Sequence, residues 1–222
     1  MTDSVTIKGK QYFVERDAET GRSLLFLYHE GISNIEEIEG LAELTYLQSL
    51  TLGENQIKEI KGLETLINLE VLSLNNNQIK EIKGLETLTK LHELYLNKNQ
   101  IEEIKGLENL TKIRKLGLYR NKISVIKGLE TLTHLEYLEL SRNRITEIRG
   151  LETLTNLKEL DLTGNRITEI KGLEKLANLE RISLRVNPIK KEHQHLLSRS
   201  WFHAQTFVKY CREQIKKDNT SI

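Results

Sequence analysis

Histidine and cysteine side chains near the C-terminus are the residues of this 222-residue chain whose types most directly suggest chemistry. His193, His195 and His203 carry imidazoles that could bind a metal ion. A His-x-His pair on a helix, however, points its two rings toward different faces, so the spacing is poor for a shared metal site. Cys211 is the single cysteine, and packing within a core suits it better than reactivity. We therefore expect no metal and no cofactor.

Motifs that bind nucleotides are missing from the sequence. Neither the phosphate-binding pattern G-x-x-x-x-G-K-[ST] nor the dinucleotide pattern G-x-G-x-x-G occurs. No spacing of serine and histidine identifies a nucleophile with its base. We predict that the chain is not an enzyme and has no catalytic residues.

Charges in the sequence nearly cancel, with 33 Lys and Arg against 32 Asp and Glu. This balance does not favour capture of nucleic acid. No apolar run has the length of about 18–20 residues that a membrane span requires. The first residues lack the apolar core of a signal peptide, and a single cysteine fits a reducing compartment. We expect a cytoplasmic protein without a nucleic-acid or membrane partner.

An internal repeat organises most of the chain. The same leucine-rich sequence pattern recurs every 22 residues from Leu47 to Leu179, and an asparagine occupies the same position in all seven copies. These asparagines are Asn55, Asn77, Asn99, Asn121, Asn143, Asn165 and Asn187. A fixed period of this length is typical of solenoids, in which each copy buries its apolar face only against its neighbours.

The shared text is L-x-x-L-x-L-x-x-N-x-I-x-x-I-x-G-L-x-x-L-x-x. It resembles the leucine-rich repeats, and its length is similar to that of the short-repeat class found in the regulatory subunit of protein phosphatase 1 and in bacterial internalins. The resemblance covers residues 25 to 189. It implies an α/β solenoid, a right-handed arc with a parallel β-sheet on its concave side. It also implies a binding module that uses this concave face.

Alternation in L-x-x-L-x-L points the leucines inward and the residues between them outward, so each copy supplies a short strand of a parallel sheet. The asparagine follows the strand, where its amide can satisfy backbone groups left unpaired by the turn. About eleven residues remain for the return, which is too short for a long helix, so we expect 3₁₀ or single-turn helical pieces on the convex side. Alternating columns of Lys and Glu there predict a solvated lattice of ion pairs.

Residues 1–23 carry no repeat and are predicted to form an N-terminal cap. Two β-prone runs flank Lys8 and Gly9, and Asp17 begins a turn. We expect a hairpin that pairs with the first repeat strand and covers the open end of the solenoid. The repeats then occupy residues 24–189, and their first copy is irregular, with Glu30 where later copies have asparagine.

Residues 190–222 are predicted to form a C-terminal helical cap and tail. One helix face can collect Leu197, Trp201, Ala204, Val208 and Cys211, with Phe207 and Tyr210 beside it. Such a face would cover the last repeat.

Outward strand positions, and the two residues that follow each strand, vary far more than the framework. Tyr95, Tyr119 and Tyr137 fall there in consecutive copies, with acidic and basic residues around them. The candidate partner-binding residues are Glu93, Tyr95, Lys98, Lys115, Tyr119, Arg120, Tyr137, Glu139, Arg142 and Asp161. Tyrosine and arginine are favoured at the centres of protein interfaces. Gly117, which lacks a side chain, could leave a shallow pocket among them. Ordinary surface variation with aromatic packing across strands is the alternative.

We predict a monomeric module that binds another protein on its concave face. Two other hypotheses remain open. One, from the resemblance alone, is a regulatory or targeting subunit of a protein phosphatase or another signalling enzyme. The other is a structural scaffold without a specific ligand.

Overall fold

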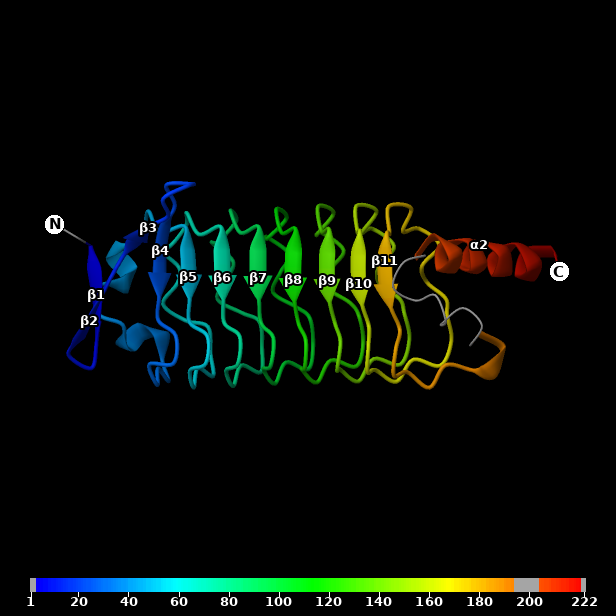
Figure 1. Cartoon of the computed structure of the whole chain (residues 1–222), viewed down its shortest axis with the longest axis horizontal. Helices are drawn as coiled ribbons and strands as arrows, with labels where there is room; N and C mark the ends of the chain where they lie inside the picture. The colour runs from blue at the N-terminus through cyan, green and yellow to red at the C-terminus, as the bar shows by residue number, and fades with distance from the viewer. Residues whose placement is uncertain (1–2, 194–203, 221–222) are drawn as a thin grey trace.

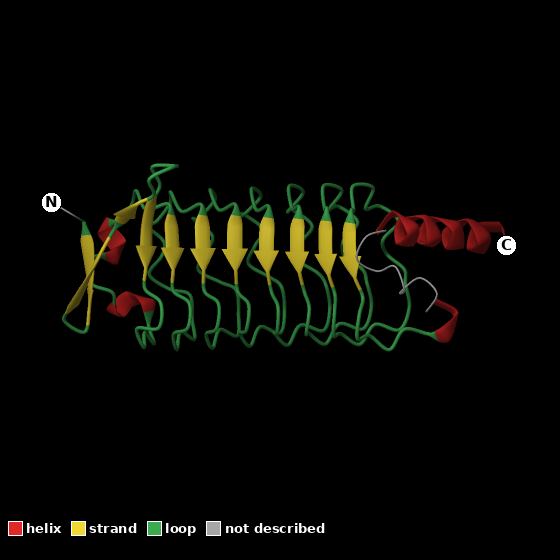
Figure 2. Ribbon diagram, viewed as in Figure 1, coloured by secondary structure: helices red, strands yellow, loops and turns green. Residues whose placement is uncertain are grey.

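The computed structural model describes residues 3–193 and 204–220, and their dominant feature is one long parallel sheet. Its parallel part begins with strand β4 (Ser23–Phe26), and each later copy adds one three-residue strand in sequence order (Figures 1 and 2). These strands are β5 (Ser49–Thr51), β6 (Val71–Ser73), β7 (Glu93–Tyr95), β8 (Lys115–Gly117), β9 (Tyr137–Glu139), β10 (Glu159–Asp161) and β11 (Arg181–Ser183). The predicted solenoid is therefore confirmed.

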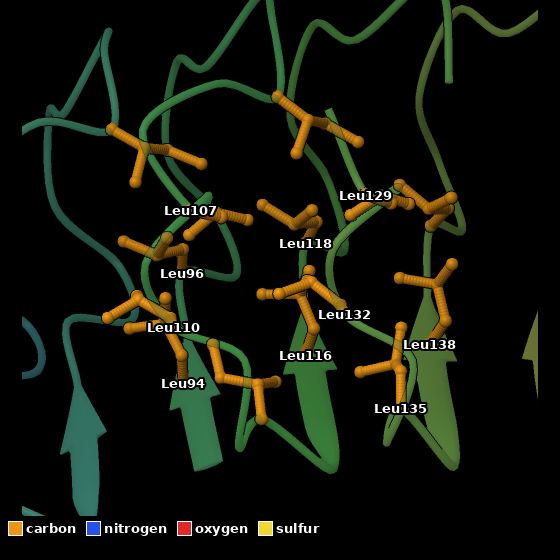
Figure 3. Close-up of a cluster of buried hydrophobic side chains, with 14 of the residues drawn as sticks. Leu94, Leu96, Leu107, Leu110, Leu116, Leu118, Leu129, Leu132, Leu135 and Leu138 are labelled. Carbon is orange, nitrogen blue, oxygen red and sulfur yellow. The ribbon is translucent and has the colours of Figure 1, made fainter. Parts of the chain in front are cut away.

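Leucines and isoleucines of the repeat build a continuous core behind the sheet. Figure 3 shows this for Leu94, Leu116 and Leu138, which extend from neighbouring strands toward the leucines of the return segments. All three side chains are fully buried. Because the strand alternates, its outward residues stay accessible on the other face, as the pattern predicted.

Asparagines of the repeat form the predicted ladder, and they also tie each copy to its predecessor. The Asn99 amide nitrogen donates to the carbonyls of Leu96 (3.1 Å), in its own copy, and Leu74 (3.0 Å), in the copy before. Its amide oxygen accepts from the backbone N–H of Ile79 at 3.0 Å. Asn99 is 8% exposed, so these backbone groups have little access to water.

Return segments on the opposite side consist of turns. In one copy, the N–H of Leu110 donates to Leu107 (2.9 Å) and the N–H of Ile113 donates to Leu110 (3.1 Å), which are 3₁₀-type bonds. The irregular first copy forms full 3₁₀ helices, η1 (Ile35–Glu37) and η2 (Leu41–Glu43). Gly106 has φ +79°, and an added Cβ would lie 2.2 Å from the carbonyl oxygen of Ile82, so neighbouring copies stack closely here.

The N-terminal cap differs from the prediction in its strand pairing. The expected hairpin forms from β1 (Ser4–Ile7) and β2 (Lys10–Phe13), but it is a separate two-stranded sheet. The strand that pairs with β4 is β3 (Glu15–Arg16), in antiparallel orientation. The predicted pairing was wrong because the turn that begins at Asp17 closes a local β3–β4 hairpin, with Asp17 donating its N–H to Arg22 at 2.9 Å.

Helix α2 (Ala204–Thr220) covers the other end of the solenoid (Figure 1). Ala204, Phe207, Val208 and Cys211 are buried, as the helical spacing predicted. The Gln205 side chain donates to the carbonyls of Ala177 (3.0 Å), at the end of the sixth copy, and Leu179 (2.7 Å), at the start of the last copy. Leu197 and Trp201 lie outside the described residues.

Before this helix, η3 (Lys191–His193) ends the first described range. The ring of His193 packs edge-on against Tyr210, with centroids 5.4 Å apart. His195 and His203 lie outside the described residues. Within residues 3–193 and 204–220, no three His, Cys, Asp or Glu side chains are grouped so that they could hold a metal ion. None of the helices in these ranges is long and apolar enough to cross a bilayer.

Candidate functional site

Strand register arranges the outward residues of the sheet into two rows. One row passes from Glu93 through Lys115 and Tyr137 to Glu159. The second row passes from Tyr95 through Gly117 and Glu139 to Asp161. We call the surface formed by these two rows the sheet face. Six of the ten predicted partner-binding residues lie on it, namely Glu93, Tyr95, Lys115, Tyr137, Glu139 and Asp161.

Glu93 forms one compact polar group with its neighbours on the sheet face. The Tyr95 hydroxyl donates to its carboxylate at 2.6 Å, and the Lys115 ammonium pairs with its other oxygen at 2.9 Å. Burial alone would raise the pKa of Glu93, but these two donors hold it below its ordinary value. Burial and the Glu93 charge also raise the pKa of Tyr95, so its hydroxyl remains a hydrogen-bond donor at neutral pH.

Glu139 and Asp161 sit opposite each other on adjacent strands without a neutralising cation. Neither carboxylate forms an ion pair with any residue in the described part of the chain. Ser141 donates to Glu139 at 3.3 Å, and the Thr163 N–H donates to Asp161 at 2.8 Å. Burial and the nearby Asp161 charge raise the pKa of Glu139. This part of the sheet face would therefore be stabilised by a positive group from outside.

Tyr137 lies beside this acidic pair and is only partly buried. Burial, followed by the charges of Glu139 and Asp161, raises its pKa to about 12. A neutral phenol with one accessible side can pack against an apolar group or donate a hydrogen bond. Aromatic and acidic character thus occur together at this point of the sheet.

A hollow of about 630 Å³ opens between Tyr95 and Tyr137. Five of the predicted residues line it, namely Glu93, Tyr95, Lys115, Tyr137 and Glu139. The remaining lining residues are His92, Arg114, Glu136, Lys158 and Glu159. Four of these occupy the position directly after the first leucine of each copy, which the prediction did not include. The sequence signal was available, because this column is ionisable in six consecutive copies, from Glu70 to Glu180.

Gly117 does not open the predicted shallow pocket. It is buried, and an added Cβ would lie 2.9 Å from the Asn97 amide and 3.1 Å from the Tyr95 ring. The two side chains therefore fill the space that the missing side chain leaves. The hollow between Tyr95 and Tyr137 lies instead toward the N-terminal ends of the strands, where His92, Arg114, Glu136 and Lys158 line it.

The other predicted residues lie where the chain leaves the strands. Arg142 stacks over the ring of Tyr119, with 5.9 Å between the guanidinium carbon and the ring centroid. Lys98, Arg120 and Arg142 all have positive φ, from +53° to +54°, and their side chains are exposed. The ten residues therefore divide between the sheet face and its strand-exit edge.

Hollows elsewhere on the described surface have a different character. Two of them, of about 440 and 720 Å³, lie where the return segments begin, after the strand-exit edge, and are lined by charged, amide and hydroxyl side chains without an aromatic ring. Aromatic residues are typical of the energetically important centres of protein interfaces. The hollow on the sheet face is the better candidate for a binding site.

Comparisons with known proteins agree with the repeat pattern. A family described as "Leucine Rich repeats (2 copies)" matches residues 67–109, and one described as "Leucine rich repeat" matches residues 111–167 and 133–189. A comparison with curated proteins gives no match.

Solved structures of bacterial proteins share the fold. An internalin (inlF) of Listeria monocytogenes is 32% identical with a TM-score of 0.70, over 79% of this chain and 54% of that one. Internalin C2 (inlC2) of the same organism is 30% identical with a TM-score of 0.69, over 76% of this chain and 73% of that one. A leucine-rich-repeat protein of Leptospira interrogans is 31% identical with a TM-score of 0.65, over 72% and 42%. The chain thus spans about half the length of the first of these proteins.

Proposed function

Because this chain belongs to the leucine-rich-repeat family, we propose that it is a protein-binding module that holds a partner protein on the concave face of its sheet. Proteins of this family, including those with internalin-like repeats, are typically interaction modules without catalytic activity. Fold membership alone does not identify a partner. The proposal about the binding surface therefore depends on the side chains of the sheet face.

The observation that carries the proposal is the juxtaposition of partly buried tyrosines with an acidic pair that has no cation among the described residues. Tyr95 and Tyr137 line the hollow, and Glu139 lies beside them with Asp161 as its neighbour. A partner that inserts an arginine or lysine could pair with the carboxylates and stack its aliphatic stem on a ring. Such a contact would combine charge complementarity with an aromatic anchor.

The scaffold supports tight binding because it requires little ordering. Backbone hydrogen bonds and the asparagine ladder hold the strands before a partner arrives, so less conformational entropy would be lost on binding. The outward positions of eight adjacent strands offer room for a footprint of about 800 Å² per partner. We expect this module to act as a monomer with a preformed surface.

Partner capture from extract of the native cell, followed by mass spectrometry, tests the proposal. The test variant is Tyr95→Ala/Tyr137→Ala, and the control is Phe13→Ala, which removes an exposed aromatic from the N-terminal cap. We expect the control to recover the same protein as the unmodified chain and the double variant to recover at least tenfold less. Equal recovery by all three proteins would refute a binding site at the tyrosines.

The regulatory and scaffold hypotheses lead to different outcomes in the same experiment. Recovery of a phosphatase catalytic subunit would support the regulatory hypothesis. Recovery of the chain itself, together with a larger mass in light scattering, would support a self-associating scaffold. Cytoplasmic localisation also remains a prediction, which microscopy of the tagged chain in its native cell would test.

A further inference from the structure

We propose that the strand-exit edge of the sheet is a second contact surface, which takes an acidic segment of the partner protein. This inference rests on the proposed function, because it assigns the chemistry of a partner already held on the sheet face. Six cations form the surface, which we call the basic edge. They are Lys98, Arg120, Lys122, Arg142, Arg144 and Arg166.

Two backbone columns place these cations side by side. One column occupies the position before the conserved asparagine, where the N–H of Arg120 donates to Ser141 (2.9 Å) and that of Arg142 donates to Thr163 (2.7 Å). The other column occupies the position after the asparagine, where the N–H of Arg144 donates to Ile123 at 2.8 Å. Each bond joins adjacent copies, so the charges repeat at the strand spacing of about 4.8 Å.

Cations of the basic edge lack the acidic partners that five cations of the return segments have. None of the six forms an ion pair with a residue in the described ranges, although Lys122 donates to Gln100 at 3.5 Å and Arg142 stacks on Tyr119. Glu102 lines the same hollow as Lys122 but pairs with no described cation. On the return segments, by contrast, five basic residues have acidic partners at 3.4–3.9 Å, in the pairs Lys61–Glu59, Lys83–Glu81, Lys127–Glu103, Arg149–Glu147 and Lys171–Glu169.

The charge of this edge changes along the solenoid. At the same two positions, the copies that begin at Leu47 and Leu69 carry Glu54, Gln56, Asn76 and Gln78. The basic residues begin at Lys98 and continue through four copies. A backbone-capping role common to all copies would not require this change, because uncharged or acidic residues occupy these positions in the first two copies. The positive charge is therefore free to serve recognition.

An acidic peptide fits this edge better than a nucleic acid does. The sheet face beside it carries the unpaired carboxylates of Glu139 and Asp161, which would repel a continuous phosphate backbone. A folded protein can instead place a basic group over these carboxylates and an acidic segment over the edge. Four copies span about 14 Å at the strand spacing, which matches about four to five residues of extended peptide. Arginine also binds carboxylates through paired hydrogen bonds.

The test measures binding of a fluorescein-labelled octaglutamate peptide to the full chain by fluorescence anisotropy. The variant Arg120→Asn/Lys122→Gln/Arg142→Asn/Arg144→Gln removes four charges. Asn and Gln already occupy the equivalent positions in earlier copies, Asn76 at φ +58° among them, so the backbone tolerates these residues. We expect this variant to bind at least about tenfold more weakly than the unmodified chain, and raising the salt to weaken the unmodified chain as well.

A matched control removes the same number of charges from the return segments, as Lys61→Gln/Lys83→Gln/Lys127→Gln/Arg149→Gln. We expect its affinity for octaglutamate to stay within about twofold of the unmodified chain. Equal weakening by both variants, or no binding by the unmodified chain, would overturn the proposal. An eight-nucleotide oligothymidine that binds the basic edge more tightly than octaglutamate would also overturn it, in favour of nucleic acid.

The same proteins separate this inference from the proposed function. If the basic-edge variant captures the cellular partner as well as the unmodified chain does, while Tyr95→Ala/Tyr137→Ala does not, only the basic edge is wrong. If both variants capture the partner fully, the binding site on the sheet face is wrong as well.

Discussion

Neighbouring asparagines of the ladder should be energetically coupled, because each strand-end carbonyl accepts from two of them. The Leu96 carbonyl accepts from Asn99 at 3.1 Å and from Asn121 at 3.0 Å. The Ile79 N–H, in contrast, donates to Asn99 alone among the described contacts. Replacing Asn99 by alanine therefore leaves the buried N–H of Ile79 without a partner. The carbonyls of Leu74 and Leu96 each lose one donor but keep another, from Asn77 and Asn121 respectively.

The expected magnitudes follow from this count. One orphaned donor costs roughly 1–3 kcal/mol, and the weakened carbonyls of Leu74 and Leu96 add at most about 0.5–1.5 kcal/mol each, so Asn99→Ala should lower the free energy of unfolding by about 1–6 kcal/mol. In Asn99→Ala/Asn121→Ala, the Leu96 carbonyl loses both donors. This double variant should cost about 1–3 kcal/mol more than the sum of the two single variants.

Urea denaturation followed by circular dichroism measures these free energies, with the slope of the transition compared among variants. The matched control is Asn99→Ala/Asn143→Ala, because Asn143 donates to Leu118 and Leu140 and shares no carbonyl with Asn99. Its effects should add within about 0.5 kcal/mol. If the adjacent pair is as additive as the separated pair, the asparagines act as independent caps and the ladder argument fails.

Three other predictions concern strain, charge and the C-terminal cap. Val186→Asn should raise the free energy of unfolding by about 1 kcal/mol in urea denaturation, because this β-branched residue has φ +56° and is 82% exposed; an unchanged midpoint would show that the backbone is not strained there. Glu139→Gln should stabilise the chain at pH 7 by roughly 0.2–1 kcal/mol, since it removes repulsion from Asp161. Folding raises the pKa of Glu139, so the charged form of this side chain opposes folding above that pKa. The stabilisation by Glu139→Gln should therefore disappear as the pH falls toward 4.5, the ordinary pKa of a glutamate, and a stabilisation that grows on acidification would contradict this. Burial raises the pKa of the Cys211 thiol from 9.0 to about 11, so at pH 8 its reaction with a disulfide reagent should be at least about 100-fold slower than in the urea-unfolded chain; equal rates would show that the cap is open.

The framework of the fold was predictable because one side-chain type repeats at each structural position. Leucine alternation identified every three-residue strand, and the recurring asparagine identified the ladder. The N-terminal pairing was less predictable, since the sequence around Asp17 indicated a turn but did not say which strand follows it. Two pairings compete for the edge of β4, the local one with β3 and the longer-range one with the β1–β2 hairpin. The local pairing closes the shorter loop and is the one that forms.

The candidate site was predictable in its location but not in its shape. Strand alternation placed Tyr95 and Tyr137 on the outward face, where the structure has them. It did not indicate that the ring of Tyr95 covers Gly117, because the direction of a side chain depends on its rotamer. It also missed Lys158, which precedes its strand yet lines the hollow. Long side chains reach beyond the positions that a strand pattern assigns to a face.

Photocrosslinking of the captured partner is the most direct test of the central claim, which is that the partner binds on the sheet face. Benzoylphenylalanine replaces Tyr137 in one protein and Ile67 in the other. Ile67 is a 51% exposed residue on a return segment, so it serves as a control position with an accessible side chain. The account predicts a crosslinked partner from position 137 and none from position 67. Crosslinking from position 67 alone would show that the partner binds the opposite side of the solenoid.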